Sequence, residues 1–548
     1  MVRQQAVSQY LIGVNNMGTK NFNSATDLIT FTRASGGTAL RKISYGSELV
    51  TNGTFDTDLS GWNNDGTTSA IVGNQIEVTS VSGVSGSGVN QTITTVAGKR
   101  YKFSSDHAPQ TGRARIEVKD NNNFGSGLET LSQTSATGTY EFVFVALSNS
   151  TYIRLEAFDT SSVVLFDNIS VKEVLYDQPD GTLQLWNHGN NEPRIEYDAT
   201  GAVKGLLIEE ARTNVAKYSE DFTNAYWKSY TAVTTTGNVA IAPDGNLTAD
   251  RIAAKNAATN NGAFTNDDVP TGGCVSVFAK ADTVDWLGFG EAGDCWAYFD
   301  LANGVTGNKS TTIGHTSITA YPNGWYLCQA WGITNSWSRV LFSPKPTEGN
   351  GDPWSNVTNA IGDSVFLWGA QMEAGAFPSS YIPTTGSTAT RAADVTTLPT
   401  SAFGYNQKAG TVLVEFKSNK PNNEQYGAFG LSDGSATNRI AYYATSVNTL
   451  VVTTAGVGQA QLSAGLRVTT SELVKFSAGY AENDFAASLN GATTVTDTAG
   501  TVPSGISSLG IGHYYAPNPS SNLINGHIKF IKYYPRRLTN TQLQELTT

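Results

Sequence analysis

Short stretches in which apolar and polar residues alternate recur along most of the chain, and this pattern restricts the possible folds more than any other feature. Examples are RARIEVKD at 113–120, TYIRLEAF at 151–158 and GTVLVEFKS at 410–418. A period of two places apolar residues on one face of a strand and polar residues on the other. Turn signals such as NG, DG and GN separate the stretches, as in antiparallel sandwiches rather than in alternating strands and helices. The sequence therefore predicts an all-β protein.

The length and the apolar runs agree with several sandwiches in tandem. At 548 residues the chain exceeds the size of one hydrophobic core, so three or four domains are expected. Runs such as VVLF at 163–166 have strand length, far below the roughly 20 residues that span a bilayer, so no membrane insertion is expected. The opening MVRQQAVSQYLIGVNN lacks the apolar core of a secretory signal. We therefore expect the protein to be made and kept in the cytosol until some other route releases it.

Charge and cysteine content exclude some partners and sites. The 35 basic and 46 acidic residues give a net charge of -11, which repels nucleic acid, so no nucleic-acid partner is expected. Cys274, Cys295 and Cys328 are odd in number and lack a CxxC spacing or a histidine partner. We interpret them as buried core residues rather than as disulfides or metal ligands.

A weak internal repeat divides the chain into modules. TNGTFDTDLSGW at 51–62 and YSEDFTNAYW at 218–227 each place a phenylalanine shortly before a tryptophan. The two blocks close with VLFDNISVKEV and VFLWGAQMEAG, respectively. We therefore expect two sandwich modules of one type, 48–176 and 215–385, and a third block of another type, 386–548.

The final stretch, YYPRRLTNTQLQELTT, predicts a strand, a proline stop and one short helix. Thr539 and Gln542 have the spacing of a capping box, and Leu538 is placed to pack against Leu543 across the start of the helix. This is the best-defined helix that the sequence predicts.

Several of these phrases resemble known families. The first module is similar to jelly-roll carbohydrate-binding modules, which open with N-G-x-F-[ED] and close with a strand that carries an aspartate. Block 386–548 resembles concanavalin A-like, laminin-G-like lectin sandwiches through GTVLVEFKS, FAASLNG and INGHIKFIKYYPRRLTNTQLQEL. The combination of FTRAS, PRIEYD, GLLIEEARTN and FLWGAQMEAGAFPSSYIPTTGSTATRAAD is similar to recurring text of tailed-bacteriophage tail and fibre proteins.

The phage resemblance implies how the modules are joined. In that family FTRAS lies close to PRIEYD, whereas here the first jelly roll stands between them, so 48–176 is interpreted as an insertion. Residues 1–47 are then expected to form a short irregular region for attachment to the virion, and 177–214 a connecting element. The implied fold is a tandem of antiparallel β-sandwiches, with two jelly-roll modules and one concanavalin A-like sandwich.

The connecting element is unusually charged for a chain with only 15% charged residues. We expect its side chains and those of residues 1–47 to pair at a joint or a subunit interface, where arginine binds carboxylates bidentately. The candidates are Arg33, Arg194, Glu196, Glu209, Glu210 and Arg212. A catalytic Glu209–Glu210 pair is the alternative. Neighbours in a strand point to opposite faces, which disfavours that alternative.

The jelly-roll resemblance implies a structural calcium site. In those modules the ion is held by the acidic residue of the opening motif and the aspartate of the closing strand, positions that Asp56 and Asp167 match here. Calcium takes six to eight oxygen ligands, and two converging strand ends can supply them. Ordinary surface aspartates are the alternative. In the second module Trp368 occupies the place of Asp167, so no equivalent ion is expected there.

Sugar sites combine flat aromatic rings with polar hydrogen-bonding groups. In the tryptophan-rich second module we expect Trp296, Tyr298 and Trp337 to be exposed platforms, and Trp325 and Trp331 to lie largely inward. In the third block the loop GHYYAPNPSSN offers His513, Tyr514 and Tyr515 for a shallow site. Core aromatics and a plain surface loop are the alternative interpretations.

Catalytic motifs are missing from the sequence. It contains no E-x-D-x-x-E strand, no G-x-S-x-G elbow, no H-E-x-x-H and no phosphate-binding loop. We therefore predict a non-catalytic virion protein, assembled in the host cytoplasm into a homo-oligomer with a trimer favoured, that contacts other virion proteins and binds bacterial surface polysaccharide. A purely architectural capsid or tail decoration protein is the main alternative, and a polysaccharide depolymerase is the third.

Overall fold

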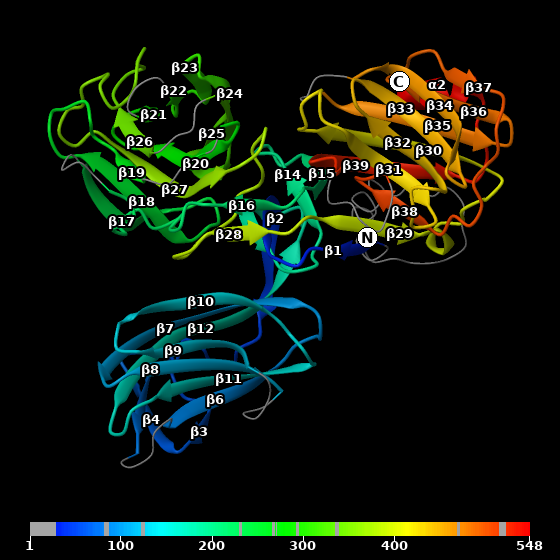
Figure 1. Cartoon of the computed structure of the whole chain (residues 1–548). Coiled ribbons are helices and arrows are strands. Elements are labelled where there is room, and N and C mark those ends of the chain that lie inside the picture. Colours follow the sequence, from blue (N-terminus) through cyan, green and yellow to red (C-terminus); the bar gives the residue numbers. More distant parts are fainter. Residues whose placement is uncertain are drawn as a thin grey trace. The chain divides into compact units, whose positions relative to one another are not determined.

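The computed structural model describes residues 29–81, 87–121, 127–228, 233–265, 269, 271–291, 295–334, 339–467, 472–514 and 522–548. The chain divides into two compact units (Figure 1). The smaller unit is Lys42–Thr182, and the larger unit joins Met1–Arg41 to Leu183–Thr548. Antiparallel strands dominate the described residues, which confirms the predicted all-β sandwich class. None of the helices in these ranges has the length and hydropathy needed to cross a membrane.

The smaller unit is a sandwich of two antiparallel sheets. One sheet contains β10 (Gly138–Val145), β7 (Arg100–Thr111), β12 (Val163–Tyr176), β2 (Gly37–Glu48), β5 (Gln75–Ser80) and β4 (Thr67–Val72). The other has the order β3 (Asn63–Asp65), β6 (Ser87–Thr94), β11 (Ser150–Ala157), β8 (Ala114–Asp120) and β9 (Gly127–Thr134). The alternating residues meet between the sheets in one core that includes Phe103, Ile116, Ile153 and Phe166.

The repeated phenylalanine and tryptophan have the same role in both jelly-roll modules. Phe55 and Trp62 are buried with ring centroids 5.6 Å apart, and the Trp62 indole donates to the carbonyl of Asn52 at 3.2 Å. In the second module the Phe222 and Trp227 rings stack at 4.6 Å, and the Trp227 indole donates to a backbone carbonyl at 2.7 Å. The repeat thus encodes a buried aromatic pair that anchors the opening segment.

The second sandwich lies in the larger unit. Its six-stranded sheet has the order β17 (Val233–Ile241), β18 (Leu247–Ala254), β27 (Ser364–Glu373), β20 (Cys274–Ala281), β25 (Tyr326–Ile333) and β24 (Ile313–Ala320). Its five-stranded sheet has the order β19 (Ala263–Thr265), β26 (Val340–Lys345), β21 (Trp286–Glu291), β22 (Cys295–Asp300) and β23 (Val305–Lys309). The three cysteines are free and buried, as predicted.

The third sandwich has two sheets of seven strands. One runs β14 (Arg194–Tyr197), β15 (Val203–Ile208), β39 (Gly526–Tyr534), β30 (Ala409–Ser418), β35 (Val474–Ala481), β36 (Asp484–Leu489) and β37 (Val495–Asp497). The other runs β1 (Thr30–Thr32), β29 (Val395–Pro399), β38 (Ser508–Ile511), β31 (Tyr426–Ser432), β32 (Arg439–Ala444), β33 (Val447–Thr454) and β34 (Val457–Leu466).

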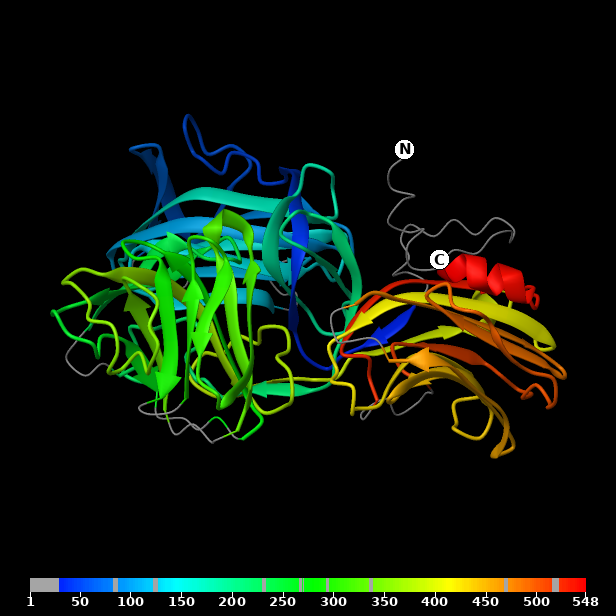
Figure 2. The same cartoon turned by 90° about the horizontal axis from the view of Figure 1, so that it is seen from above.

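The C-terminal helix α2 (Asn540–Thr547) packs on the outer face of this sandwich, against β35 and β36 (Figure 2). Thr539 and Gln542 form the predicted capping box, with both reciprocal hydrogen bonds present. Leu538 and Leu543 share a small buried cluster with Ala486, which confirms the predicted contact across the helix start.

The charged connecting element is built into the third sandwich. β14 and β15 extend one sheet, and Ile195 and Leu206 lie in its core. The FTRAS segment supplies β1, which pairs with β29 at the edge of the other sheet. Two further strands join the second and third sandwiches, β16 (Arg212–Asn214) and β28 (Ala389–Arg391), which pair with each other. β13 (Thr182–His188) brings Leu185 to the buried indoles of Trp325 and Trp368.

Candidate functional site

The five-stranded sheet of the smaller unit carries a grid of polar side chains on its outer face. The strands that pack on β8 and β11 from outside this sheet are β5, β7 and β12, all on its apolar side. On the opposite side, β11 carries Tyr152, Arg154 and Glu156, which are 6%, 8% and 1% exposed. The register places Thr92, Asn90 and Gly88 of β6 beside these residues, and Lys119, Glu117 and Arg115 of β8 beside them on the other flank. We call these nine residues, together with Asp65, the polar face.

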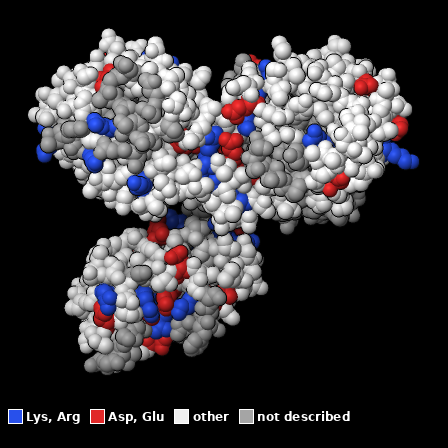
Figure 3. All heavy atoms as spheres, viewed as in Figure 1, with Lys and Arg blue, Asp and Glu red and all other residues white. Residues whose placement is uncertain are grey.

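Ion pairs link the long side chains of the polar face in a row. Figure 3 shows basic and acidic side chains side by side on the surface of the smaller unit. Arg154 binds Asp65 at 2.8 Å through Nη1 and Glu156 at 2.6 Å through Nε. Glu156 is shared with Arg115, whose pKa it raises by accepting a hydrogen bond. Glu117 binds Lys119 at 3.0 Å. Because each charge has a partner of opposite sign, the row is ordered before any ligand arrives.

The polar face is unusually well packed for an outer face. Glu156 is only 1% exposed, and Gly88 lies opposite it. A Cβ at Gly88 would lie 2.5 Å from the carbonyl oxygen of Leu155 and 2.9 Å from Cγ of Glu156, so a larger residue does not fit beside the glutamate. The guanidinium of Arg115 covers the half-buried ring of Phe158 at 4.7 Å, and burial raises the pKa of Tyr152. The face therefore combines charged forks, an amide, hydroxyls and aromatic edges.

The polar face is not among the sites predicted from the sequence, although the sequence carries a signal for it. RARIEVKD and TYIRLEAF predict strands with one apolar face. Their polar positions hold arginine, glutamate and lysine. Long charged residues at alternate positions of two paired strands meet in rows, and this pattern marks the face.

The predicted calcium residues Asp56 and Asp167 lie in the smaller unit. Asp56 is exposed and accepts a hydrogen bond from Thr54 at 2.7 Å. Asp167 is half-buried; burial raises its pKa, and the nearby carboxylates of Asp106 and Asp56 add to the effect. The two predicted ligands are thus close enough to interact. Within the described ranges no group of three or more His, Cys, Asp or Glu residues is arranged to hold a metal ion. Calcium binding stays a prediction.

The aromatic platform prediction for the second module is wrong at Tyr298. Tyr298 is 0% exposed, and its hydroxyl donates to the carbonyl of Gly351 at 2.9 Å. Trp296, on the same face of β22, is half-buried and meets the Tyr298 ring edge to face at 5.8 Å. The loop that contains Gly351 covers this face, which strand alternation cannot reveal. Trp337 lies outside the described residues.

Among the other described indoles of this module, three are buried and three are half-buried. Trp325 is fully buried, as predicted. Trp331 is half-buried and stacks on the exposed His315 at 5.2 Å, so the prediction that it lies inward holds only in part.

In the third sandwich the prediction for His513 is wrong as well. His513 is 1% exposed, and its Nε2 lies 3.0 Å from the carbonyl of Thr396. Gly510 makes this possible, because a Cβ there would lie 2.4 Å from the imidazole. Tyr514 is half-buried beneath the guanidinium of Arg439 at 5.3 Å, and Tyr515 lies outside the described residues.

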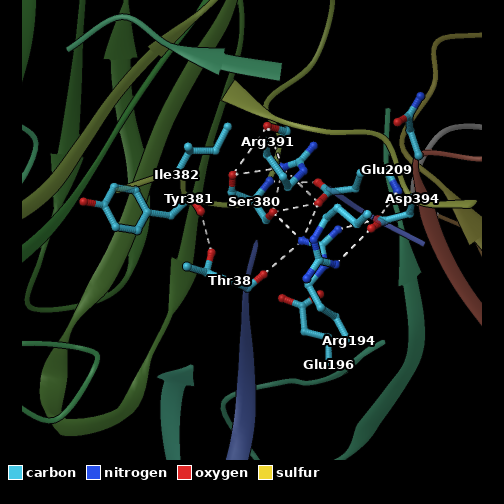
Figure 4. A network of polar contacts seen from close by, with 12 residues as sticks. Thr38, Arg194, Glu196, Glu209, Ser380, Tyr381, Ile382, Arg391 and Asp394 are labelled. Carbon is cyan, nitrogen blue, oxygen red and sulfur yellow. Dashed lines mark hydrogen bonds and ion pairs between the residues drawn. The ribbon is translucent and has the colours of Figure 1, made fainter. Parts of the chain in front are cut away.

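The charged residues of the connecting element form a buried network with Arg391 and Asp394 (Figure 4). Asp394 binds Arg33 at 3.0 Å and Arg194 at 2.5 Å, and its Oδ2 accepts from the backbone N–H of Glu209. Glu209 in turn binds Arg194 at 2.8 Å and Arg391 at 3.2 Å. Burial alone would raise the pKa of Glu209, but these two arginines hold it at about 2.

The other predicted charges are paired at the same joint. Glu196 binds Lys204 at 2.8 Å and also contacts His527. Glu210 binds Arg212 at 2.6 Å. Glu209 and Glu210 therefore have separate sets of partners and do not converge on one bond, which argues against a catalytic pair of these two glutamates.

No family model matches the chain, and no curated protein sequence matches it either. Three similar solved structures are as follows. The N-terminal cellulose-binding domain of Cellulomonas fimi β-1,4-glucanase C is 18% identical and aligns over 23% of this chain and 97% of its own, with a TM-score of 0.21. The CBM22-1–CBM22-2 tandem domain of Paenibacillus barcinonensis Xyn10C is 12% identical over 60% of this chain and 98% of its own, with a TM-score of 0.21.

A Trypanosoma rangeli sialidase in complex with sialic acid is 12% identical over 93% of this chain and 98% of its own, with a TM-score of 0.23. At TM-scores this low, none of the three similarities assigns a ligand or a residue role to this chain.

Proposed function

We propose that this protein is a non-catalytic structural protein of a bacteriophage particle, in the tail or a fibre, and that its smaller unit binds a host-surface glycan. The polar face is the observation that carries the glycan part of the proposal. The phage part is supported by the recurring phrases FTRAS, PRIEYD and GLLIEEARTN. Other virion proteins and a homo-oligomeric assembly, with a trimer favoured, belong to the same proposal.

The polar face has the chemistry that a sugar chain needs. Each pyranose offers hydroxyls that both donate and accept, and the face supplies guanidinium donors, carboxylate acceptors, and the amide and hydroxyl of Asn90 and Thr92. Positions on one face recur at about 6.6 Å along a strand and about 4.8 Å between strands, so several hydroxyls of one chain can be met at once. The half-buried ring of Phe158, beneath the guanidinium of Arg115, adds an apolar surface.

The balance of charge on this face indicates the class of glycan. The cations Arg115, Lys119 and Arg154 are matched by the carboxylates of Asp65, Glu117 and Glu156. With no excess charge, the face favours a neutral polysaccharide over a strongly anionic or cationic one.

Multivalency compensates for the modest affinity of a single glycan site. One outward face of this kind offers a shallow site of modest affinity. Linked copies in an oligomer raise the avidity by orders of magnitude without any new contact at each site.

The burial of the indoles favours a second candidate function, a purely architectural protein. None of the nine tryptophans in the described part of the chain is an exposed side chain, and five are buried. The described part of the second sandwich therefore shows no exposed indole platform, and its charged network with the third sandwich resembles a rigid structural joint.

A glycan array probed with the full-length protein separates the two proposals. If the smaller unit binds glycans, the neutral bacterial polysaccharides on the array are expected to retain the protein. Arg154→Lys is expected to weaken this retention. The architectural alternative expects no retention on any glycan.

A further inference from the structure

The second sandwich contains a lysine whose amine is sealed inside the fold. Lys345 ends β26 and has a relative exposure of 0%. Its Nζ donates to the backbone carbonyl of Thr259 at 2.7 Å and to that of Val357 at 3.1 Å. The third neighbour of Nζ is the side-chain Oδ1 of Asn359, at 3.3 Å. Three acceptors thus fix the position of the amine.

Asn359 is buried, and its amide is held in one orientation. Its Nδ2 donates to the carbonyl of Pro344 at 2.8 Å, and its backbone N–H donates to the carbonyl of Ala258 at 3.0 Å. A longer contact of 3.4 Å joins Nδ2 to Oδ2 of Asp363, which is itself oriented by the backbone N–H of Ala360 at 2.8 Å. The amide therefore turns its carbonyl to the lysine and its amino group to a carboxylate.

We propose that Lys345 and Asn359 join in an intramolecular isopeptide bond, with Asp363 carrying a proton to the leaving group. The site contains the three groups that this reaction needs: a buried amine, an amide carbonyl beside it, and a carboxylate at the amide nitrogen. Because the amine and the amide are held in contact, the reaction is intramolecular. For well-oriented groups in such reactions, the effective molarity reaches about 10⁵ M or more.

The reaction balances without a co-reactant. The electron pair of the neutral Nζ of Lys345 forms a new bond to Cγ of Asn359. The bond between Cγ and Nδ2 then breaks, and Nδ2 leaves as ammonia after it receives a proton through Asp363. An ammonium group and a primary amide thus become a secondary amide and an ammonium ion, with no oxidant or reductant.

Burial favours the neutral form of the Lys345 amine, which is the form that attacks the amide of Asn359. Desolvation lowers the pKa of Lys345 to about 7, although Asp352 and Asp363 oppose this shift. A lysine with the ordinary pKa of about 10.4 is almost fully protonated at neutral pH, whereas here much of the amine is neutral. A neutral amine has two N–H bonds, which the carbonyls of Thr259 and Val357 accept. These two bonds are fewer than the three acceptors around Nζ, so in the neutral form one acceptor faces the electron pair of the amine.

The bond would close the loop from 345 to 359 and tie β26 to the segment before β27. This loop covers Tyr298 through the carbonyl of Gly351. A covalent link across it restricts the unfolded chain, as any crosslink does, and would slow unfolding of the second sandwich.

Intact-mass measurement of the full-length protein tests the proposal. The linked chain is expected to be lighter than its sequence by about 17 Da, the mass of the ammonia released. Cleavage after Glu348 separates Lys345 from Asn359 into different peptides. The proposal expects these two peptides to be recovered as one branched species. Asn359→Ala and Asp363→Asn are expected to keep the full mass and give separate peptides.

Lys309→Met is the matched control, because Lys309 also donates to a backbone carbonyl, that of Ile313 at 2.5 Å, but is outside the cluster. This variant is expected to show the same mass loss as the natural chain. A natural chain of full mass after prolonged incubation at pH 8, with the two peptides separate, overturns the proposal whether or not any variant folds. A mass loss that maps to other residues overturns it too.

Discussion

Asp394 and Arg33 are 361 positions apart in the sequence, yet their side chains meet at 3.0 Å and neither is exposed to solvent. The same carboxylate binds Arg194 and the backbone N–H of Glu209. One residue thus holds the FTRAS strand, the connecting element and the segment between the second and third sandwiches. In the larger unit this buried charge network therefore joins segments that are far apart in the sequence.

Replacing Asp394 with alanine is expected to destabilise the larger unit by about 3 to 5 kcal/mol, because it leaves two buried guanidinium groups without their carboxylate. Denaturant unfolding of the full chain measures this effect. Asp484→Ala is the matched control, since Asp484 forms a 2.9 Å pair with Arg537 but is 53% exposed. A change of less than about 1 kcal/mol is expected for the control. Equal effects of the two variants would contradict the role given to the network.

The stability of the larger unit is expected to fall at acidic pH because Glu209 becomes protonated. Its pKa is held at about 2 in the folded chain, below the value of 4.5 for the free side chain. A lowered pKa contributes stability that is present above about pH 4.5 and is lost as the pH falls towards 2. The size of this contribution is about 3 kcal/mol. Glu209→Gln is expected to remove this pH dependence, and an unchanged acid profile in the variant would contradict the assignment.

Calcium is expected to raise the thermal midpoint of the smaller unit by roughly 5 °C or more when it saturates the predicted site. Calorimetry of the full chain with calcium and with chelator measures the shift. Asp167→Asn is expected to abolish the shift, while Asp58→Asn, an exposed carboxylate of the same opening segment, is expected to leave it intact. An identical thermal midpoint with calcium and with chelator would contradict the predicted calcium site.

Alternation predicted the strands because it reports which face of a strand is buried, and the capping box at Thr539 predicted α2 because its signal is local. The failures at Tyr298 and His513 have a different origin. Tyr298 is covered by a loop some 50 positions away in the sequence, and His513 lies over Gly510 beneath a neighbouring strand. Burial of this kind depends on tertiary packing, which no local pattern reports.

For the charged network, the sequence shows the charged residues but not their partners. Arg33, Arg194 and Glu209 were recognisable as charges that need partners. Their shared partner Asp394 lies 361 positions after Arg33 and 200 positions after Arg194, and the third arginine, Arg391, lies in the same stretch, which resembles recurring phage text. Pairing over that separation becomes visible only in the fold.

Binding of the full-length protein to neutral bacterial surface polysaccharides on a glycan array tests the central claim most directly. Arg154→Lys keeps the charge but loses the fork that joins Asp65 and Glu156, so it is expected to weaken retention about tenfold or more. Lys99→Ala is the matched control, because Lys99 pairs with Glu173 at 2.7 Å elsewhere in the smaller unit. Retention that falls with Arg154→Lys and not with Lys99→Ala is the result predicted here. Retention of no glycan by the natural chain, or equal retention by both variants, would contradict the claim.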